Sequence, residues 1–389
     1  MDFELQWQWL LWALPLVFGL GWFASRWDAR QWQRDLKGSQ RIYYKGLNLL
    51  LNEQHDKAID AFIEAVQQDP DTSDLHFALG NLFRRRGEYE RAVRVHKHLL
   101  GRADLPRSER DRAQHALAQD FMKAGLFDRA EEGYAALAGT AFDTEARLAL
   151  LDLHERSRNW RAALAVARQL ETSGAGSFAS RIAHYWCEIA HEADAAPGDG
   201  SADDAVAQAR EAAPRDARPL VLAGERAAVR GDHADALRSW TLLMSVRPAA
   251  FNLVARRYAT SARATGTQAS ALERLQSLYE QTPTMELLRA IASLHDDADS
   301  SRRTLLGHLR EHPSLAAAGA VLAALATPAL DGAAAPVELT AVRDAIRRAA
   351  RPLHRYRCAA CGFETERYFW HCPGCLGWDS YPPLRLEDL

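Results

Sequence analysis

The chain has 389 residues, of which 48% are hydrophobic and 25% are charged, and its formal net charge is −3. These values are ordinary for a folded protein and leave enough chain to bury a substantial core. The near-neutral balance lacks the basic excess that is common in proteins whose main role is to bind nucleic acid.

An apolar, uncharged run extends from Leu5 to Ala24 in the sequence MDFELQWQWLLWALPLVFGLGWFASRWDAR. Some twenty helical residues span about 30 Å, the thickness of a bilayer core. Tryptophans flank the run at both ends, as in an aromatic belt. A cleaved signal peptide fits poorly, because Asp2 and Glu4 stand where basic residues are usual. We therefore predict a transmembrane anchor over residues 1–24, with a buried core helix as the alternative.

The flanks of this run predict its orientation. No basic side chain precedes it, whereas several follow: Arg26, Arg30, Arg34, Lys37 and Arg41. By the positive-inside rule, the rest of the chain faces the cytoplasm. Low cysteine use agrees with a reducing compartment, since only Cys187 lies outside a C-terminal cluster, and we expect Cys187 to serve in packing.

The middle of the chain repeats with a period of 34 residues, which separates Gly46 from Gly80 and Ala58 from Ala92. This period is typical of the tetratricopeptide repeat, a helix–turn–helix unit in which small residues let two helices approach closely. A turn motif recurs as GEYERA (87–92) and GLFDRA (125–130), with weaker copies at 158–163, 231–236 and 266–271. We predict an α-solenoid over residues 35–350. Its anchor alanines are Ala58, Ala92, Ala130, Ala163, Ala205, Ala236 and Ala271.

Two polar or Pro/Gly-rich segments, 101–111 and 194–204, are predicted to be loops between repeats. A degenerate unit is expected at 284–313. The Ala- and Gly-rich stretch 313–335 is unlike a regular repeat, and a last helix is predicted over 338–350.

The concave face of such a solenoid, lined by the first helix of each repeat, usually binds a peptide or protein. The repeat register places a basic patch there in the second and third units, suited to an acidic or carboxylate-bearing segment. The alternative is a solvated charged face. Walker, GxGxxG, HExxH and GxSxG motifs are absent, so we predict that the protein is not an enzyme. The candidate partner-binding residues are Phe77, Asn81, Arg84, Arg112, His115 and Gln119.

Four of the five cysteines lie near the C-terminus in the pattern C-x2-C-x10-C-x2-C. Four thiolates can surround one tetrahedral metal ion, and zinc is the default for a closed site of this kind. Gly362 and Pro373–Gly374 supply turn geometry, and FETERYFW (363–370) between them predicts a short β-hairpin. A module of this size has too little core, so metal binding supplies the missing folding free energy. The predicted ligands are Cys358, Cys361, Cys372 and Cys375.

Alternatives to a zinc site remain open at this point. The same four sulfurs can hold iron and transfer one electron. We prefer zinc because no flavin or other redox partner domain is recognisable, and disulfides are disfavoured on the cytoplasmic side. A membrane-tethered RNA-binding scaffold is a further alternative, although we expect no nucleic-acid partner. It would use the basic run Arg343, Arg347, Arg348, Arg351, Arg355 and Arg357.

The anchor, the repeat segments GLNLLLNEQHDKAIDAF, GNLFRRRGEYERAVRVH and AGLFDRAE, and the terminal YRCAACGF…YFWHCPGCLGW together resemble the lipopolysaccharide assembly protein B family of Gram-negative bacteria. The resemblance implies an all-α tetratricopeptide-repeat solenoid with an N-terminal transmembrane helix. It also implies a small rubredoxin-like zinc-ribbon domain at 354–389, packed against the repeats, with the four cysteines as its metal ligands.

The same resemblance implies a function. Members are single-pass inner-membrane adaptors whose bulk lies in the cytoplasm. They work with the membrane protease FtsH to promote degradation of the deacetylase that commits carbon to lipid A. A membrane-embedded sensor of lipopolysaccharide opposes them, and a homo-oligomer is compatible with this picture.

Overall fold

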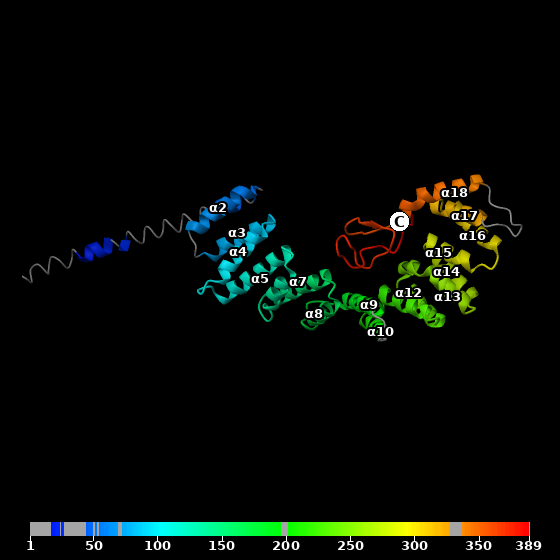
Figure 1. Cartoon of the computed structure of the whole chain (residues 1–389), viewed down its shortest axis with the longest axis horizontal. Coiled ribbons are helices and arrows are strands. Elements are labelled where there is room, and N and C mark those ends of the chain that lie inside the picture. The colour runs from blue at the N-terminus through cyan, green and yellow to red at the C-terminus, as the bar shows by residue number, and fades with distance from the viewer. Residues whose placement is uncertain are drawn as a thin grey trace, which may run out of the picture. The chain divides into compact units, whose positions relative to one another are not determined.

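The computed structural model describes residues 17–23, 25–26, 44–49, 51–52, 54–68, 72–195, 201–326 and 337–388. The chain divides into two compact units, one ending at Leu153 and the other running from His154 to Leu389. In both units, helices that follow one another in the sequence pack side by side, as Figure 1 shows for α3 and α4. This succession of antiparallel pairs is the tetratricopeptide-like solenoid that the 34-residue period predicts.

The first unit is built from short helices that the repeat pattern anticipates. Residues 44–49 are helical and precede the first full helix. The helices are α2 (His55–Gln68), α3 (Ser73–Arg85), α4 (Tyr89–Leu100), α5 (Arg107–Lys123), α6 (Phe127–Ala135) and α7 (Asp143–Arg156), whose last turn belongs to the second unit.

The second unit continues the pattern and ends in a small β-containing module. Its helices are α8 (Trp160–Thr172), α9 (Ala179–Ala195), α10 (Ser201–Ala212), α11 (Ala217–Val229), α12 (His233–Val246), η1 (Pro248–Leu253), α13 (Ala255–Ala264), α14 (Gln268–Gln281), α15 (Met285–Leu294), α16 (Ala298–Glu311), α17 (Leu315–Ala326), α18 (Val337–Ala350) and η2 (Arg351–His354). Two strands follow, β1 (Tyr356–Arg357) and β2 (Glu364–Thr365).

The predicted anchor lies largely outside the described residues, which include 17–23 of it as a helical stretch. Within the described part of the chain, none of the helices combines the length and the apolar character needed to span a membrane.

The recurring turn motif produces one backbone conformation each time it appears. Gly87, Gly125, Gly231 and Gly266 all have φ between 71° and 81°, in the left-handed region that glycine enters without steric cost. The weaker copy at 158–163 puts Arg158 at the same place with φ of 55°. The turn is therefore conserved in shape across the repeats even where its glycine is missing.

The anchor alanines pack where the two helices of each repeat approach most closely. All seven are buried, with at most 3% of their surface exposed. Glycine serves the same purpose on the facing helix. A Cβ added at Gly80 would lie 2.5 Å from ring atoms of His96, and one added at Gly224 would collide with Trp240. Small residues at this spacing thus set the distance between helices, as the sequence predicts.

Two local predictions need correction. The loop expected at 101–111 ends earlier, because α5 begins at Arg107, and the one expected at 194–204 gives way to α10 at Ser201. The stretch 313–335, whose sequence is unlike a regular repeat, contains the helix α17, which packs on α16 and α18. The short helix η1, between α12 and α13, is a feature that the repeat pattern does not anticipate.

We predict that Gly80→Ala destabilises the first unit by about 1–3 kcal/mol through overpacking. The His96 ring cannot easily move away, because it is fully buried and its Nδ1 lies 2.5 Å from an oxygen of Asp120. Gly101→Ala is the matched control, since its added Cβ would meet only backbone oxygens at 3.5 Å or more. Hydrogen exchange across α3 and α4 in the full chain measures the effect. Equal protection in the two variants would show that close helix approach is not the constraint.

Candidate metal centre and its contacts with the repeats

The C-terminal module is organised around a two-stranded hairpin. β1 pairs antiparallel with β2, with Tyr356 opposite Thr365 and Arg357 opposite Glu364. The hairpin predicted within 363–370 therefore forms with a different first strand, which lies before the first cysteine pair. The reason is that the loop containing Cys358 and Cys361 reverses the chain, and the Cys358 amide donates to the Phe363 carbonyl at 3.0 Å.

This folding brings the four predicted cysteine ligands together. All four sulfur atoms lie within 4.8 Å of one another. The Sγ atoms of Cys358 and Cys375 are 3.8 Å apart, and those of Cys361 and Cys372 are 3.7 Å apart. A tetrahedral zinc ion with Zn–S bonds of about 2.3 Å separates its ligands by about 3.8 Å. The four sulfurs can thus hold one metal ion.

Each cysteine pair is closed by a residue in a left-handed conformation. Gly362 has φ of 77°, and its amide donates to the Cys358 carbonyl at 2.9 Å. In the second pair Leu376 takes this position with φ of 59°, donating to the Cys372 carbonyl at 2.9 Å. Gly374 has another role, because a Cβ there would lie 3.4 Å from the Cys361 sulfur. The second turn therefore uses its glycine for close approach and a leucine for the strained position.

The surroundings of the buried sulfurs favour the thiolate form. Burial raises the pKa of Cys358, but hydrogen bonds from Ser380 and from two backbone amides outweigh it and bring the pKa to about 6. Burial also raises the pKa of Cys372, and backbone amides of Cys375 and Gly374 bring it below its ordinary value. Donors at sulfur stabilise the charged form, and the thiolate is the form that binds metal. By contrast, burial raises the pKa of Cys187 to about 12, which fits its predicted packing role.

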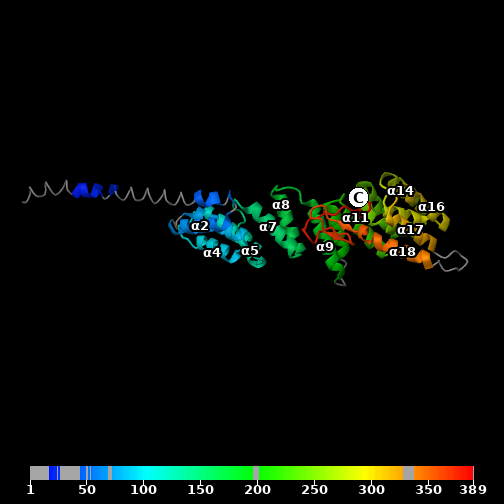
Figure 2. The ribbon, with the colours of Figure 1, turned by 90° about the horizontal axis from the view of Figure 1, so that it is seen from above.

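Trp378 is the main contact between this module and the repeats of the second unit. Its ring stacks on His184 of α9 with centroids 4.6 Å apart, and His371 stacks on it at 4.3 Å. Trp160 of α8 meets the same ring edge-on. Figure 2 shows the C-terminal segment overlying α9 and α11. An aromatic cluster of this kind buries a large apolar area in a defined orientation.

Polar contacts fix the orientation of Trp378. Its indole nitrogen donates to Glu155 at the end of α7 at 3.0 Å. Tyr185 and Arg181 also donate to Glu155, which is only 5% exposed. Beside it, His184 lies 2.8 Å from an Asp379 oxygen. A buried carboxylate with three donors is costly to disturb, so this contact holds the module in one place.

A second contact joins the end of the chain to α15. Arg385 donates to Glu286 at 3.0 Å, and Asp388 accepts from the amide of Met285 at 3.1 Å. Leu253 of η1 packs against the module's small core. The module therefore contacts the repeats at two separate places in the second unit.

The basic run before the module is partly neutralised by neighbouring acids. Arg351 lies 3.1 Å from Glu366, and Arg357 lies 2.7 Å from Glu364, with Arg355 nearby at 3.6 Å. Arg355 and Arg357 therefore pair with Glu364 of the hairpin, and Arg351 pairs with Glu366.

The candidate partner-binding residues fall on the first helices α3 and α5, as predicted, but not all are open to solvent. Phe77 is buried, with the Arg112 guanidinium 4.0 Å above its ring. Arg84 donates to Asp120 at 2.8 Å and to Asn81 at 2.5 Å, and its side chain is only 17% exposed. Arg84 is therefore mostly covered, because a buried carboxylate on α5 draws its side chain inward.

The remaining candidates lie along α5. Arg112 is half-exposed and pairs with Asp74 of α3 at 2.9 Å. The His115 and Gln119 side chains approach to 3.4 Å, and His115 lies 3.7 Å from Glu145. Burial lowers the pKa of His115 from its ordinary value. These side chains form a polar strip across α3 and α5.

Sequence reasoning missed three residues that organise these sites. Asp120 is fully buried between Arg84 and His96. An acidic residue on the apolar face of a helix is a signal that the sequence does contain. Glu155 gives no such local signal. Trp378 lies three residues after the last cysteine of the motif, yet its role depends on helices some 200 residues earlier in the chain. Its hydrogen bond to Glu155 spans 223 residues.

We predict that Cys372→Ser loses the metal ion, because a three-sulfur site forfeits much of the binding free energy that folds the module. Metal content per chain should fall from one to well below one. Hydrogen exchange should rise across 356–388 while α9–α12 stay protected. Cys187→Ala is the control and should keep its metal. Stoichiometric metal in the Cys372→Ser chain would contradict the assignment of Cys372 as a ligand.

Comparison with known proteins agrees with this arrangement. The family model described as a rubredoxin metal binding domain matches residues 356–382. A tetratricopeptide repeat protein from Parabacteroides merdae, known from its crystal structure, is 13% identical with a TM-score of 0.29, covering 74% of this chain and 98% of that one. This value is too low to support any further comparison.

Two curated relatives extend over nearly the whole chain. Lipopolysaccharide assembly protein B of Escherichia coli K12 is 30% identical over 380 residues, covering 96% of this chain and 97% of the relative. The protein of the same name from Haemophilus influenzae is 25% identical over 403 residues, with 96% and 98% covered. Identity at this level over almost the full length of both chains shows that the protein belongs to the lipopolysaccharide assembly protein B family.

Proposed function

We propose that this protein is a non-enzymatic adaptor that regulates lipopolysaccharide synthesis at the bacterial inner membrane. The observation that carries the proposal is the similarity to lipopolysaccharide assembly protein B over 96% of the chain. The solenoid supports it, because repeat surfaces of this kind bind proteins. In this role the chain brings the membrane protease FtsH to the lipid A pathway deacetylase, and a membrane sensor of lipopolysaccharide opposes it.

The four cysteines serve a structural purpose in this proposal. Cys358, Cys361, Cys372 and Cys375 hold one metal ion, with zinc preferred over iron. The bound ion supplies folding free energy to a module whose own buried cluster is small, made of Tyr356, Cys358, Cys372 and Tyr381. The folded module then presents Trp378 to Glu155 and the aromatic rings of α8 and α9. The metal site thereby stabilises the repeats of the second unit that the module contacts.

The partner surface is the polar strip across α3 and α5. Arg112, His115 and Gln119 are the side chains that a partner would meet. Asn81, Arg84 and Phe77 support them from below, since Arg84 and Phe77 are mostly buried. An acidic segment of a partner would replace the Asp74 carboxylate beside Arg112, which makes binding an exchange of charged hydrogen bonds.

Tethering is tested by removing residues 1–24. The truncated chain should stay folded and lose regulation, because a membrane anchor raises the effective concentration near a membrane protease. The measurement is the level of the deacetylase in cells that express the chain at its native level. An unrelated single-span anchor fused in place of residues 1–24 is the control and should restore regulation. If the truncated chain complements the gene deletion at native levels, the anchor is dispensable.

The strip is tested with Arg112→Glu. Recovery of the protease and the deacetylase in crosslinked pull-downs from membranes should fall about tenfold, since a charged contact is lost and repulsion is added. Stability should fall by about 1–2 kcal/mol, because the half-exposed Arg112–Asp74 pair and the contact of Arg112 with the Phe77 ring are both lost. Arg84→Glu is unsuitable, because it would remove the arginine partner of buried Asp120 and place a second carboxylate beside it, destabilising the unit by about 3–5 kcal/mol.

Arg107→Glu is the matched control, with the same charge change at the exposed first turn of α5. It should keep full recovery of both partners. Equal recovery with Arg112→Glu and Arg107→Glu would mean that this strip is an ordinary solvated face.

A further inference from the structure

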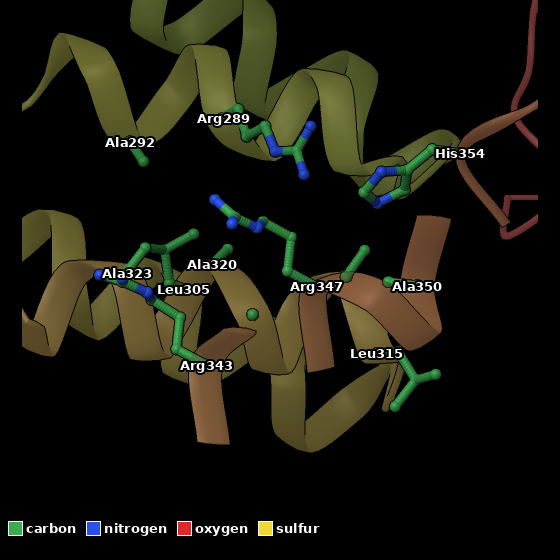
Figure 3. A pocket seen from close by; sticks show the side chains of 12 residues that line it. Arg289, Ala292, Leu305, Leu315, Ala320, Ala323, Arg343, Arg347, Ala350 and His354 are labelled. Atoms are coloured by element: carbon green, nitrogen blue, oxygen red, sulfur yellow. The ribbon is translucent and has the colours of Figure 1, made fainter. Parts of the chain in front are cut away.

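A pocket of about 600 Å³ lies between α15, α16, α17, α18 and η2, away from the cysteine cluster. Its volume falls in the range of sites that hold small ligands. Figure 3 shows side chains reaching into it from helices on opposite sides. Its apolar lining is made of small side chains and two leucines: Ala292, Leu305, Leu315, Ala316, Gly319, Ala320, Ala323 and Ala350.

The polar lining is entirely cationic or neutral donor in character. Arg289 and Arg347 extend toward each other across the pocket, and His354 stands beside Arg289. Arg343 completes the set. Among the described residues that line the pocket there is no carboxylate, amide or hydroxyl side chain.

Nearby acids balance these arginines only in part. Arg289 lies 3.5 Å from Glu286, whose carboxylate also accepts from Arg385 at 3.0 Å. Asp344 is shared by Arg343 at 3.4 Å and Arg347 at 3.6 Å. These separations exceed the 2.7–2.9 Å that is usual for charge-assisted hydrogen bonds. Three arginines are therefore brought together around a cavity. Besides Glu286 and Asp344, the acids that interact with this cluster are Glu387 and Asp388, and burial raises the pKa of both carboxyl groups, that of Glu387 to about 7.

His354 is the titratable group of the lining, and several neighbours act on its pKa. Burial lowers this pKa, the guanidinium groups of Arg289 and Arg385 lower it further, and the Glu286 carboxylate raises it. Glu387 lies 3.7 Å from the ring and is 2% exposed.

We propose that this pocket binds an amphiphile with one acyl chain and a phosphate monoester head. The head would accept hydrogen bonds from Arg289, Arg343 and Arg347, since a phosphate offers three oxygens and up to two charges to a cluster of guanidinium groups. The hydrocarbon chain would lie on the alanine and leucine floor. The site is separate from the metal centre and does not depend on the proposed adaptor role.

A peptide fits the same lining less well. A peptide backbone brings as many N–H donors as carbonyl acceptors, and each buried donor needs an acceptor. Among the described lining side chains only a neutral His354 has an acceptor nitrogen, so most amides of a buried peptide would lack partners. An acyl chain makes no such demand, and small floor residues leave room for a thin, flexible chain.

The test uses the full chain in a neutral, sugar-headed detergent, so that detergent tails compete equally in every arm. The probe is a monoacylglycerol phosphate that carries a photoreactive diazirine in its chain. Crosslinked peptides are mapped by mass spectrometry, and Kd is measured by titration. The comparison arms are the fatty acid with a carboxylate head, the neutral monoacylglycerol, inorganic phosphate and an acidic peptide.

We expect crosslinks in α17 and α18, and tighter binding of the phosphate-headed probe than of the carboxylate or neutral forms. The triple variant Arg289→Gln, Arg343→Gln, Arg347→Gln should weaken binding at least about tenfold, the effect of a single lost charge-assisted hydrogen bond. Arg348→Gln, an exposed neighbour on α18 outside the lining, is the matched control and should bind like the wild type.

A second variant addresses the floor without touching charge. Ala323→Leu fills part of the pocket from an exposed position on α17, and should weaken the acyl probes while leaving the fold intact. Equal binding of the neutral monoacylglycerol, or unchanged binding in both variants, would overturn the proposal. So would competition by inorganic phosphate as strong as that of the amphiphile, which would indicate a simple anion site. Binding of the acidic peptide alone would instead indicate a protein partner.

Discussion

The fold of the C-terminal module depends on holding four sulfur atoms in one small volume. Residues 356–388 contain a hairpin whose two strands have two residues each, and a buried cluster of four side chains, two of which are cysteines. Such a core is too small to offset the chain entropy lost on folding. A metal ion that bridged the two loops would supply the missing free energy, and the sulfur separations of 3.7 and 3.8 Å suit such an ion.

The C-terminal module also contacts helices that are far from it in the sequence. Once the module is folded, Trp378 becomes the meeting point of α7, α8 and α9, because its indole nitrogen satisfies the buried Glu155 carboxylate. Arg385 and Asp388 add a second contact at α15. Helices of a solenoid normally contact only their neighbours. Here a segment at the end of the chain joins helices that are far apart in sequence, which restrains the second unit more than nearest-neighbour packing would.

Buried charge plays a comparable part in the first unit. Asp120 has no access to solvent and is joined to Arg84 and His96, on the helices α3 and α4. A buried carboxylate without partners would cost several kcal/mol, so the three side chains act as one unit. The half-exposed Arg112 and the mostly covered His115 lie above this network. Substitution of Arg112 can therefore test the proposed partner binding, whereas substitution of Arg84 would also disturb the buried network.

The sequence by itself determined the features that depend on local spacing. The 34-residue period predicts the helix pairs and the burial of Ala58 and Ala92, and the two CxxC pairs predict the sulfur cluster. The tertiary structure alone decided which polar residues are buried. Arg84 turns inward because Asp120 lies opposite it, and Trp378 docks because Glu155 is 223 residues away in sequence but 3.0 Å away in space. The cationic pocket beside α17 likewise needs four helices and the turn after them. Such features arise from contacts between segments that are distant in the sequence, and a periodic pattern does not predict those contacts.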